Sequence, residues 1–133
     1  MSTDKMQSYD PKMTLDPRQW NLLDEYERVA MVVKYHQEAG IELPDENAHA
    51  LLHVVVENQI AQGDEMPVEA VLHRLTDDNL DRHDAVHAIA GVLTNHMFEL
   101  MHGDDAALGN DAYFAELEKL TAEKWQRGDY TEG

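Results

Sequence analysis

The stretch that decides the fold lies at residues 49–60, His49-Ala-Leu-Leu-His53-Val-Val-Val-Glu57-Asn-Gln-Ile60. In a helix, its apolar side chains would cover nearly the whole circumference, so that the helix is stable only in the middle of a bundle. A short buried strand over 51–56 is the alternative. We favour a helix because helical character continues over about 16 positions, longer than a typical strand. The stretch therefore predicts the central helix of an all-α protein.

The chain on either side divides into further helices at N-cap residues, prolines and glycines. No segment shows a convincing strand pattern. Four residues of the first helix form an apolar stripe that is expected to face the core and to be continued by His36; they are Leu22, Tyr26, Val29 and Val33. The expected helices run from Asp16-Pro17 to Gly40, from Pro44-Asp45 to Ala61, from Pro67 through Leu75, from Asp81 to Gly103 and from Asn110 to Gly128.

The length of 133 residues suits one domain, a bundle of four to five helices at residues 16–128. Residues 1–15 lack any periodicity and are expected to form a flexible N-terminal arm, and residues 129–133 a C-terminal tail. A helix that is apolar on all sides needs covering, and a symmetric dimer is the commonest way to provide it. We therefore expect a homodimer.

Charge restricts the partners that this chain can bind. The sequence has 27 acidic and 10 basic residues, a formal net charge of −17 with histidine neutral. Such a surface repels phosphate, which argues against binding to nucleic acid or to anionic membrane and favours a basic protein as partner. No apolar run approaches a membrane span, the N-terminus lacks the apolar part of a signal peptide, and there is no cysteine. These features predict a cytoplasmic protein.

Histidines supply the candidate site. Six residues are placed so that they could meet between helices, His49, His53 and Glu57 on the central helix, His83 and His87 on the fourth and His36 on the first. Imidazole and carboxylate groups four residues apart can bind one metal ion from a single helix, and a facing helix can complete the coordination. Without cysteine, the ligand set suits iron, zinc, manganese or nickel.

Two other interpretations of the histidines stay open. They could be structural groups satisfied by backbone carbonyls or by Glu27, Glu57 or Asp84, in an acidic protein–protein interaction module without metal. They could also form a pH sensor, since eight histidines titrate near neutrality. Nothing in the sequence predicts an organic cofactor, because there is no glycine-rich phosphate loop, and no motif defines an enzyme.

The stretch from His49 to Tyr113, with HALLH, ENQ and RHDAVHAIAGVL, resembles a bacterial family known only as a domain of unknown function, which implies a fold but no activity. In outline, His53/Glu57 followed by His83/His87 also resembles the paired motifs of hemerythrin-like proteins, whose first helix adds a histidine, as His36 would here. Their last-helix H-x4-D has no counterpart in this chain. DinB-like bundles, with one histidine and a later H-x3-H, are similar to the same degree. These resemblances imply a helical metal-binding bundle.

Overall fold

The computed structural model of the chain describes residues 6, 8–41, 45–63, 66–103 and 111–126. Within these ranges it has no strand, which confirms the predicted all-α class and the single-domain bundle. The segment at 51–56 is helical. The described residues form seven α-helices, α1 (Pro17–Asn21), α2 (Glu25–Glu38), α3 (Glu46–Ala61), α4 (Val68–Asp77), α5 (Arg82–Met101), α6 (Asp111–Lys119) and α7 (Ala122–Gln126).

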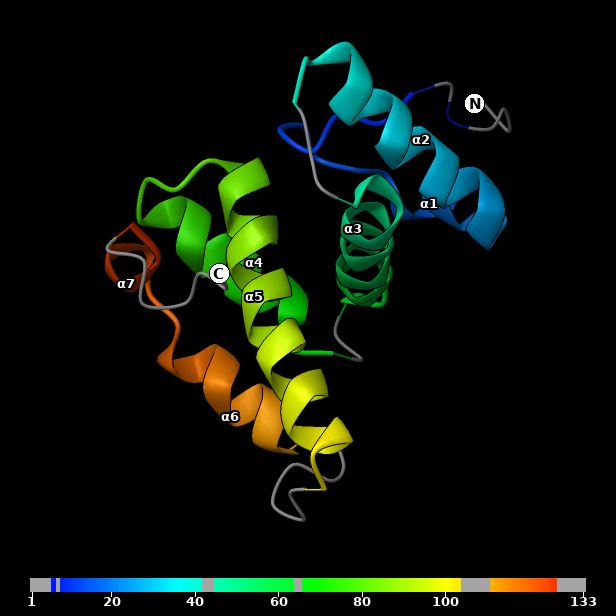
Figure 1. The fold of residues 1–133 in the computed structure, drawn as a ribbon. Helices are drawn as coiled ribbons and strands as arrows, with labels where there is room; N and C mark the ends of the chain where they lie inside the picture. The colour runs from blue at the N-terminus through cyan, green and yellow to red at the C-terminus, as the bar shows by residue number, and fades with distance from the viewer. Residues whose placement is uncertain (1–5, 7, 42–44, 64–65, 104–110, 127–133) are drawn as a thin grey trace.

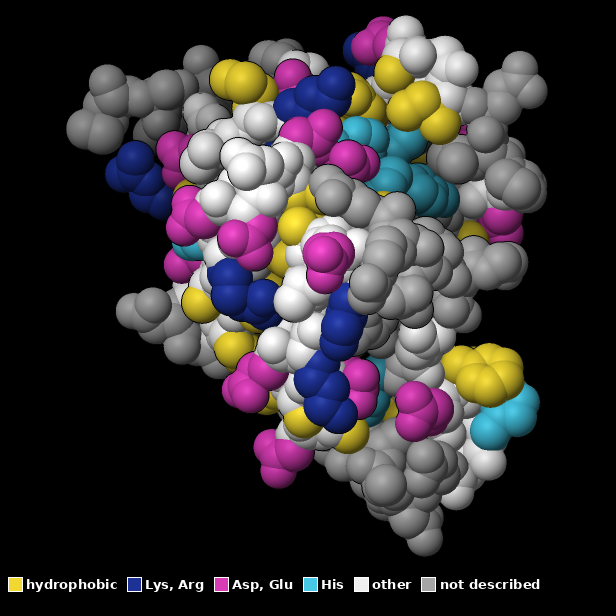
Figure 2. Space-filling view, turned by 90° about the vertical axis from the view of Figure 1, so that its left-hand side faces the viewer, with side chains coloured by type: hydrophobic (Ala, Val, Ile, Leu, Met, Phe, Trp, Pro, Cys, Tyr) yellow, Lys and Arg dark blue, Asp and Glu magenta, His cyan; other side chains and the backbone are white. Residues whose placement is uncertain are grey.

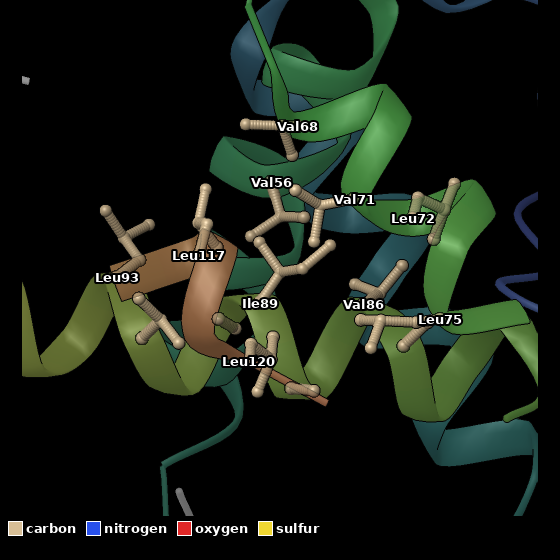
Figure 3. Packing of buried hydrophobic residues seen from close by; sticks show 14 of the residues in the cluster. Val56, Val68, Val71, Leu72, Leu75, Val86, Ile89, Leu93, Leu117 and Leu120 are labelled. Atoms are coloured by element: carbon tan, nitrogen blue, oxygen red, sulfur yellow. The ribbon is translucent and has the colours of Figure 1, made fainter. Parts of the chain in front are cut away.

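Helix α3 occupies the middle of the molecule, between α1 and α2 on one side and α4 and α5 on the other (Figure 1). Its adjacent valines serve two separate apolar clusters. Val54 packs with Trp20 and Val32 from the α1–α2 side. Val56 belongs to the larger cluster, where it packs among residues of α4, α5 and α6 (Figure 3). The all-round apolar character of α3 therefore reflects its position between two cores.

Two of the expected helices are each divided in two. Leu22 ends α1, and α2 begins anew at Glu25. The cause is a capping box in which the Asp24 carboxylate accepts from the backbone N–H of Glu27, and the Glu27 carboxylate accepts from that of Asp24. The last expected helix divides into α6 and α7, where the Thr121 hydroxyl accepts from the backbone N–H of Lys124.

The apolar stripe expected to bury α2 is only partly buried. Leu22 is 48% exposed and Tyr26 is 83% exposed, so the prediction is wrong for these two residues. The side of α2 that faces the core instead carries Val32 and His36, one turn apart. The expected inward direction of His36 is confirmed, because His36 is buried; it lies about one turn after both Val32 and, in the expected stripe, Val33.

Part of the expected N-terminal arm lies against the bundle. Tyr9 and Pro11 are buried, and Tyr9 packs against Trp20 in the smaller cluster. Residues 1–5 and 7 and the expected tail at 129–133 lie outside the described residues. None of the described helices combines the length and the apolar character needed to cross a membrane.

Candidate metal centre

Helices α2, α3 and α5 bring four histidines together. Each of the four offers one ring nitrogen, and these nitrogens all lie within 4.8 Å of one another; the residues are His36, His49, His53 and His87. His49 and His53 are one turn apart on α3, as their spacing predicts. His36 comes from the last part of α2 and His87 from the first half of α5. The sequence-predicted meeting of three helices at one place is therefore present, and the cluster could hold a metal ion.

The first of these rings has its orientation fixed by the backbone. His36 is buried, and its Nδ1 lies 2.9 Å from the carbonyl oxygen of Val32, one turn earlier on α2. A carbonyl can only accept, so Nδ1 carries the proton and donates it. The Nε2 of the same ring then has a free lone pair, and it has no hydrogen-bond partner in the structure. His36 is thus held in the tautomer that a metal ion requires.

A tyrosine fixes the second ring in the same way. The Tyr9 hydroxyl donates to Oε2 of Glu57 at 2.6 Å and lies 3.1 Å from Nδ1 of His53. Because its only proton goes to the carboxylate, the hydroxyl oxygen must accept from Nδ1–H of His53. The lone pair of His53 is therefore on Nε2, which lies 2.9 Å from Nε2 of His87.

Unsatisfied nitrogens gather at this centre. Among the described residues four buried side-chain polar atoms lack a hydrogen-bond partner, and three of them are the Nε2 atoms of His36, His49 and His83. Leaving a buried polar group without a partner costs about 1–3 kcal/mol. His83 lies outside the group of four but next to it, with its ring centroid 4.3 Å from that of His87. An ion bound by the group of four could satisfy the unpartnered nitrogens of His36 and His49 at once.

Burial keeps four of the histidines neutral. Burial first, and then the neighbouring histidines, lower the pKa of His83 to about 4 and that of His87 to about 3. The pKa of His49 and that of His53 are lowered by the same two causes, burial first. Near pH 7, protons therefore do not compete for the lone pairs, which is the state in which imidazole binds metal.

Glu57 does not join the group of four, although its spacing on α3 predicted a ligand. Its carboxylate is completely buried and binds Arg82 through two contacts of 2.7 and 2.8 Å, while Oε2 also accepts from Tyr9. The buried guanidinium needs a counter-charge, and Glu57 supplies it. Glu57 thus contacts His53 indirectly, through the Tyr9 hydroxyl.

The carboxylates considered as structural partners of the histidines are positioned elsewhere. Glu27 takes part in the capping box of α2, and Glu57 binds Arg82 and Tyr9. Asp84 is exposed in the first turn of α5. The sequence analysis did not identify Tyr9 and Arg82 as part of the site. The position of Arg82 directly before His83 is a signal that could have identified it. Tyr9 gives no such signal, because it belongs to a segment without any periodicity.

The centre is closed on one side and reaches the surface on the other. The Tyr35 ring packs edge-on against His36 and His83, with centroids 5.1 and 5.6 Å away. His49 and His87 are half-buried. Figure 2 shows a group of histidine side chains on the upper part of one face, with acidic side chains beside it. The rings of His49 and His87 therefore lie at the edge of the bundle.

Comparison with known proteins gives no match to a family model, to a curated protein or to a solved structure. The function has to be inferred from the arrangement of the histidines.

Proposed function

We propose that this chain is a metal-binding protein whose centre consists of His36, His49, His53 and His87. The observation that carries the proposal is the approach of four ring nitrogens, from three helices, to within 4.8 Å of one another. Two of the four rings are held by hydrogen bonds through Nδ1, which leave the lone pair on Nε2. Such orientation of ligands by partners outside the centre is typical of metal sites.

The spacing of the nitrogens suits a small divalent ion. A tetrahedral zinc ion with Zn–N bonds of about 2.0–2.1 Å separates its ligand atoms by about 3.3 Å. The nitrogens of His53 and His87 are 2.9 Å apart, and no pair in the group exceeds 4.8 Å. An ion would draw the wider pairs together and replace the close imidazole–imidazole contact by two metal bonds.

The ligand type selects among the metals. Imidazole nitrogen suits zinc, copper, iron and nickel, whereas manganese favours carboxylate and other oxygen ligands. The carboxylate of Glu57 is paired with Arg82 and lies outside the group, so the four proposed ligands are all imidazoles. A set of four protein ligands is also characteristic of structural zinc sites, since catalytic sites keep one position open. We therefore propose a zinc-type ion that stabilises the junction of α2, α3 and α5.

Elemental analysis of the full chain, reconstituted with Zn²⁺ and then desalted, tests this proposal. Wild type is expected to retain about one equivalent, and the variant His53→Ala/His87→Ala to retain none. The matched control is His73→Ala/His102→Ala, which removes two exposed histidines and should keep the ion. Absence of bound metal in wild type, or equal metal in the two double variants, would overturn the proposal. The acidic interaction module with structural histidines would then be the better hypothesis.

A further inference from the structure

The segment at residues 8–15 is attached to the bundle beside the histidines at two points. The Tyr9 hydroxyl contacts Glu57 and His53, and the carbonyl oxygen of Pro11 accepts from Nη1 of Arg82 at 2.9 Å. Both attachments involve the buried ion pair between Glu57 and Arg82. A part of the chain that precedes the first helix is therefore connected to the ion pair next to the centre.

One hydroxyl links this segment to a proposed ligand. Protons are donated in a single direction, from Nδ1 of His53 to the Tyr9 oxygen and from the Tyr9 hydroxyl to the Glu57 carboxylate. The negative charge at the end of this chain polarises the imidazole and makes its Nε2 a better electron-pair donor. If the hydroxyl is lost, Nδ1–H has no partner inside a buried site, and the tautomer of His53 is no longer fixed.

We propose that Tyr9 is a positioning residue for the metal centre, and that ion binding and attachment of residues 8–15 therefore stabilise each other. This inference rests on the proposed function. Tyr9 would act through His53, not as a ligand itself. The coupling is reciprocal. If the bond between Tyr9 and His53 strengthens ion binding, then ion binding must strengthen that bond by the same free energy.

The ring of Tyr9 also makes packing contacts, which a suitable substitution can keep while it removes the hydroxyl. It packs against Trp20 and Tyr35, with centroid distances of 6.0 and 6.1 Å. Phenylalanine keeps these apolar contacts and removes only the hydroxyl. Tyr113 offers a matched control, because it is also buried and its hydroxyl also donates over 2.6 Å, to Gln59. It packs in the larger cluster among α4, α5 and α6.

The experiment compares Tyr9→Phe with Tyr113→Phe in the full chain. Zn²⁺ affinity is measured by competition with a chromophoric chelator, and the ligand field is measured from the visible absorption of the Co²⁺-loaded protein. Tyr9→Phe is expected to weaken Zn²⁺ binding about 10- to 100-fold and to shift the Co²⁺ bands. Tyr113→Phe should leave both unchanged, although it loses a hydrogen bond of the same length.

Hydrogen exchange of the wild-type chain tests the reciprocal effect without any substitution. Zn²⁺ is expected to slow exchange of the backbone amides at residues 8–15. If wild type binds Zn²⁺ but Tyr9→Phe matches Tyr113→Phe in affinity and spectrum, the positioning role is refuted and the metal centre stands. Unchanged exchange at 8–15 on Zn²⁺ binding would refute the coupling. If wild type binds no Zn²⁺, the proposed function fails and this inference fails with it.

Discussion

Two histidines, His36 and His53, carry their protons on Nδ1 for reasons unrelated to any metal. A backbone carbonyl accepts from one and a tyrosine oxygen from the other. In both cases the lone pair is on Nε2, which has no partner in His36 and lies 2.9 Å from Nε2 of His87 in His53. Free imidazole exists as two tautomers, so fixing one of them removes part of the cost of ligand binding. If the proposed centre binds an ion, these two ligands are oriented before the ion arrives.

The ion pair between Glu57 and Arg82 is the strongest charge interaction near the centre. Replacing Glu57 by glutamine should reduce the free energy of unfolding by about 3–5 kcal/mol, because Arg82 would remain buried without a counter-charge. Urea denaturation of the metal-free protein measures this loss. The control Glu116→Gln removes an exposed ion pair with Lys119 and should cost less than about 1 kcal/mol. Equal effects of the two substitutions would show that the buried pair does not support the fold.

The group of four contains most of the histidines that their spacing singled out, but neither His83 nor Glu57. Positions i and i+4 share one face of a helix whatever surrounds them, so the pairs on α3 and α5 follow from local geometry. What a carboxylate on that face binds depends on its neighbours in space. Glu57 meets Arg82, which is 25 residues away in the sequence, and a charged neighbour of this kind leaves no periodic signal.

Among the helices, α3 follows most directly from its own residues. Apolar side chains on all sides predict a central helix, and the structure places α3 between two clusters. Helix α2 was less predictable, because an apolar stripe shows that a helix is amphipathic without fixing its rotation. A shift of one residue turns a helix by about 100°, which is enough to expose Tyr26 and bury Val32.

The attachment of the segment before α1 could not be predicted from sequence patterns. Residues 8–15 have no periodicity, and a flexible arm was the natural expectation. Their attachment depends on three hydrogen bonds to side chains of α3 and α5. Each of these bonds joins residues more than 40 positions apart. Long-range polar contacts of this kind depend on the folded arrangement and not on local propensity.

For the molecule as a whole, the net charge of −17 and the neutral histidines act together. A negative field raises the local concentration of cations and speeds their association. It does not by itself retain an ion, since exposed carboxylates are strongly hydrated and screened by salt. In the proposed function, the acidic surface would favour delivery of a metal ion to the site, and the imidazoles at the junction of three helices would supply the specific binding.

Acid should destabilise the metal-free protein. The folded-state pKa of His83 is lowered to about 4 and that of His87 to about 3, from an ordinary value of 6.5. Below pH 6.5 the unfolded chain binds protons that the folded chain does not, so stability falls as the pH falls. Between pH 7.5 and 5.5 these two histidines alone should reduce the free energy of unfolding by about 3 kcal/mol.

Urea denaturation in the presence of a chelator, at pH 7.5, 6.5 and 5.5, measures this dependence. The variant His73→Ala/His102→Ala should show the same decrease as wild type, because both of its altered histidines are exposed. Stability that stays constant or rises toward pH 5.5 would contradict the buried, neutral state of the cluster. Addition of Zn²⁺ at pH 7.5 should raise the stability of both proteins, since an ion that binds only the folded chain stabilises it.

X-ray absorption at the metal edge of the Zn²⁺-loaded full chain tests the central claim most directly, because it reports the type, number and distance of the ligand atoms. We expect four nitrogen neighbours at about 2.0–2.1 Å, with the multiple scattering that imidazole rings produce. A shell dominated by oxygen, or one with fewer than three imidazoles, would contradict a centre built from His36, His49, His53 and His87.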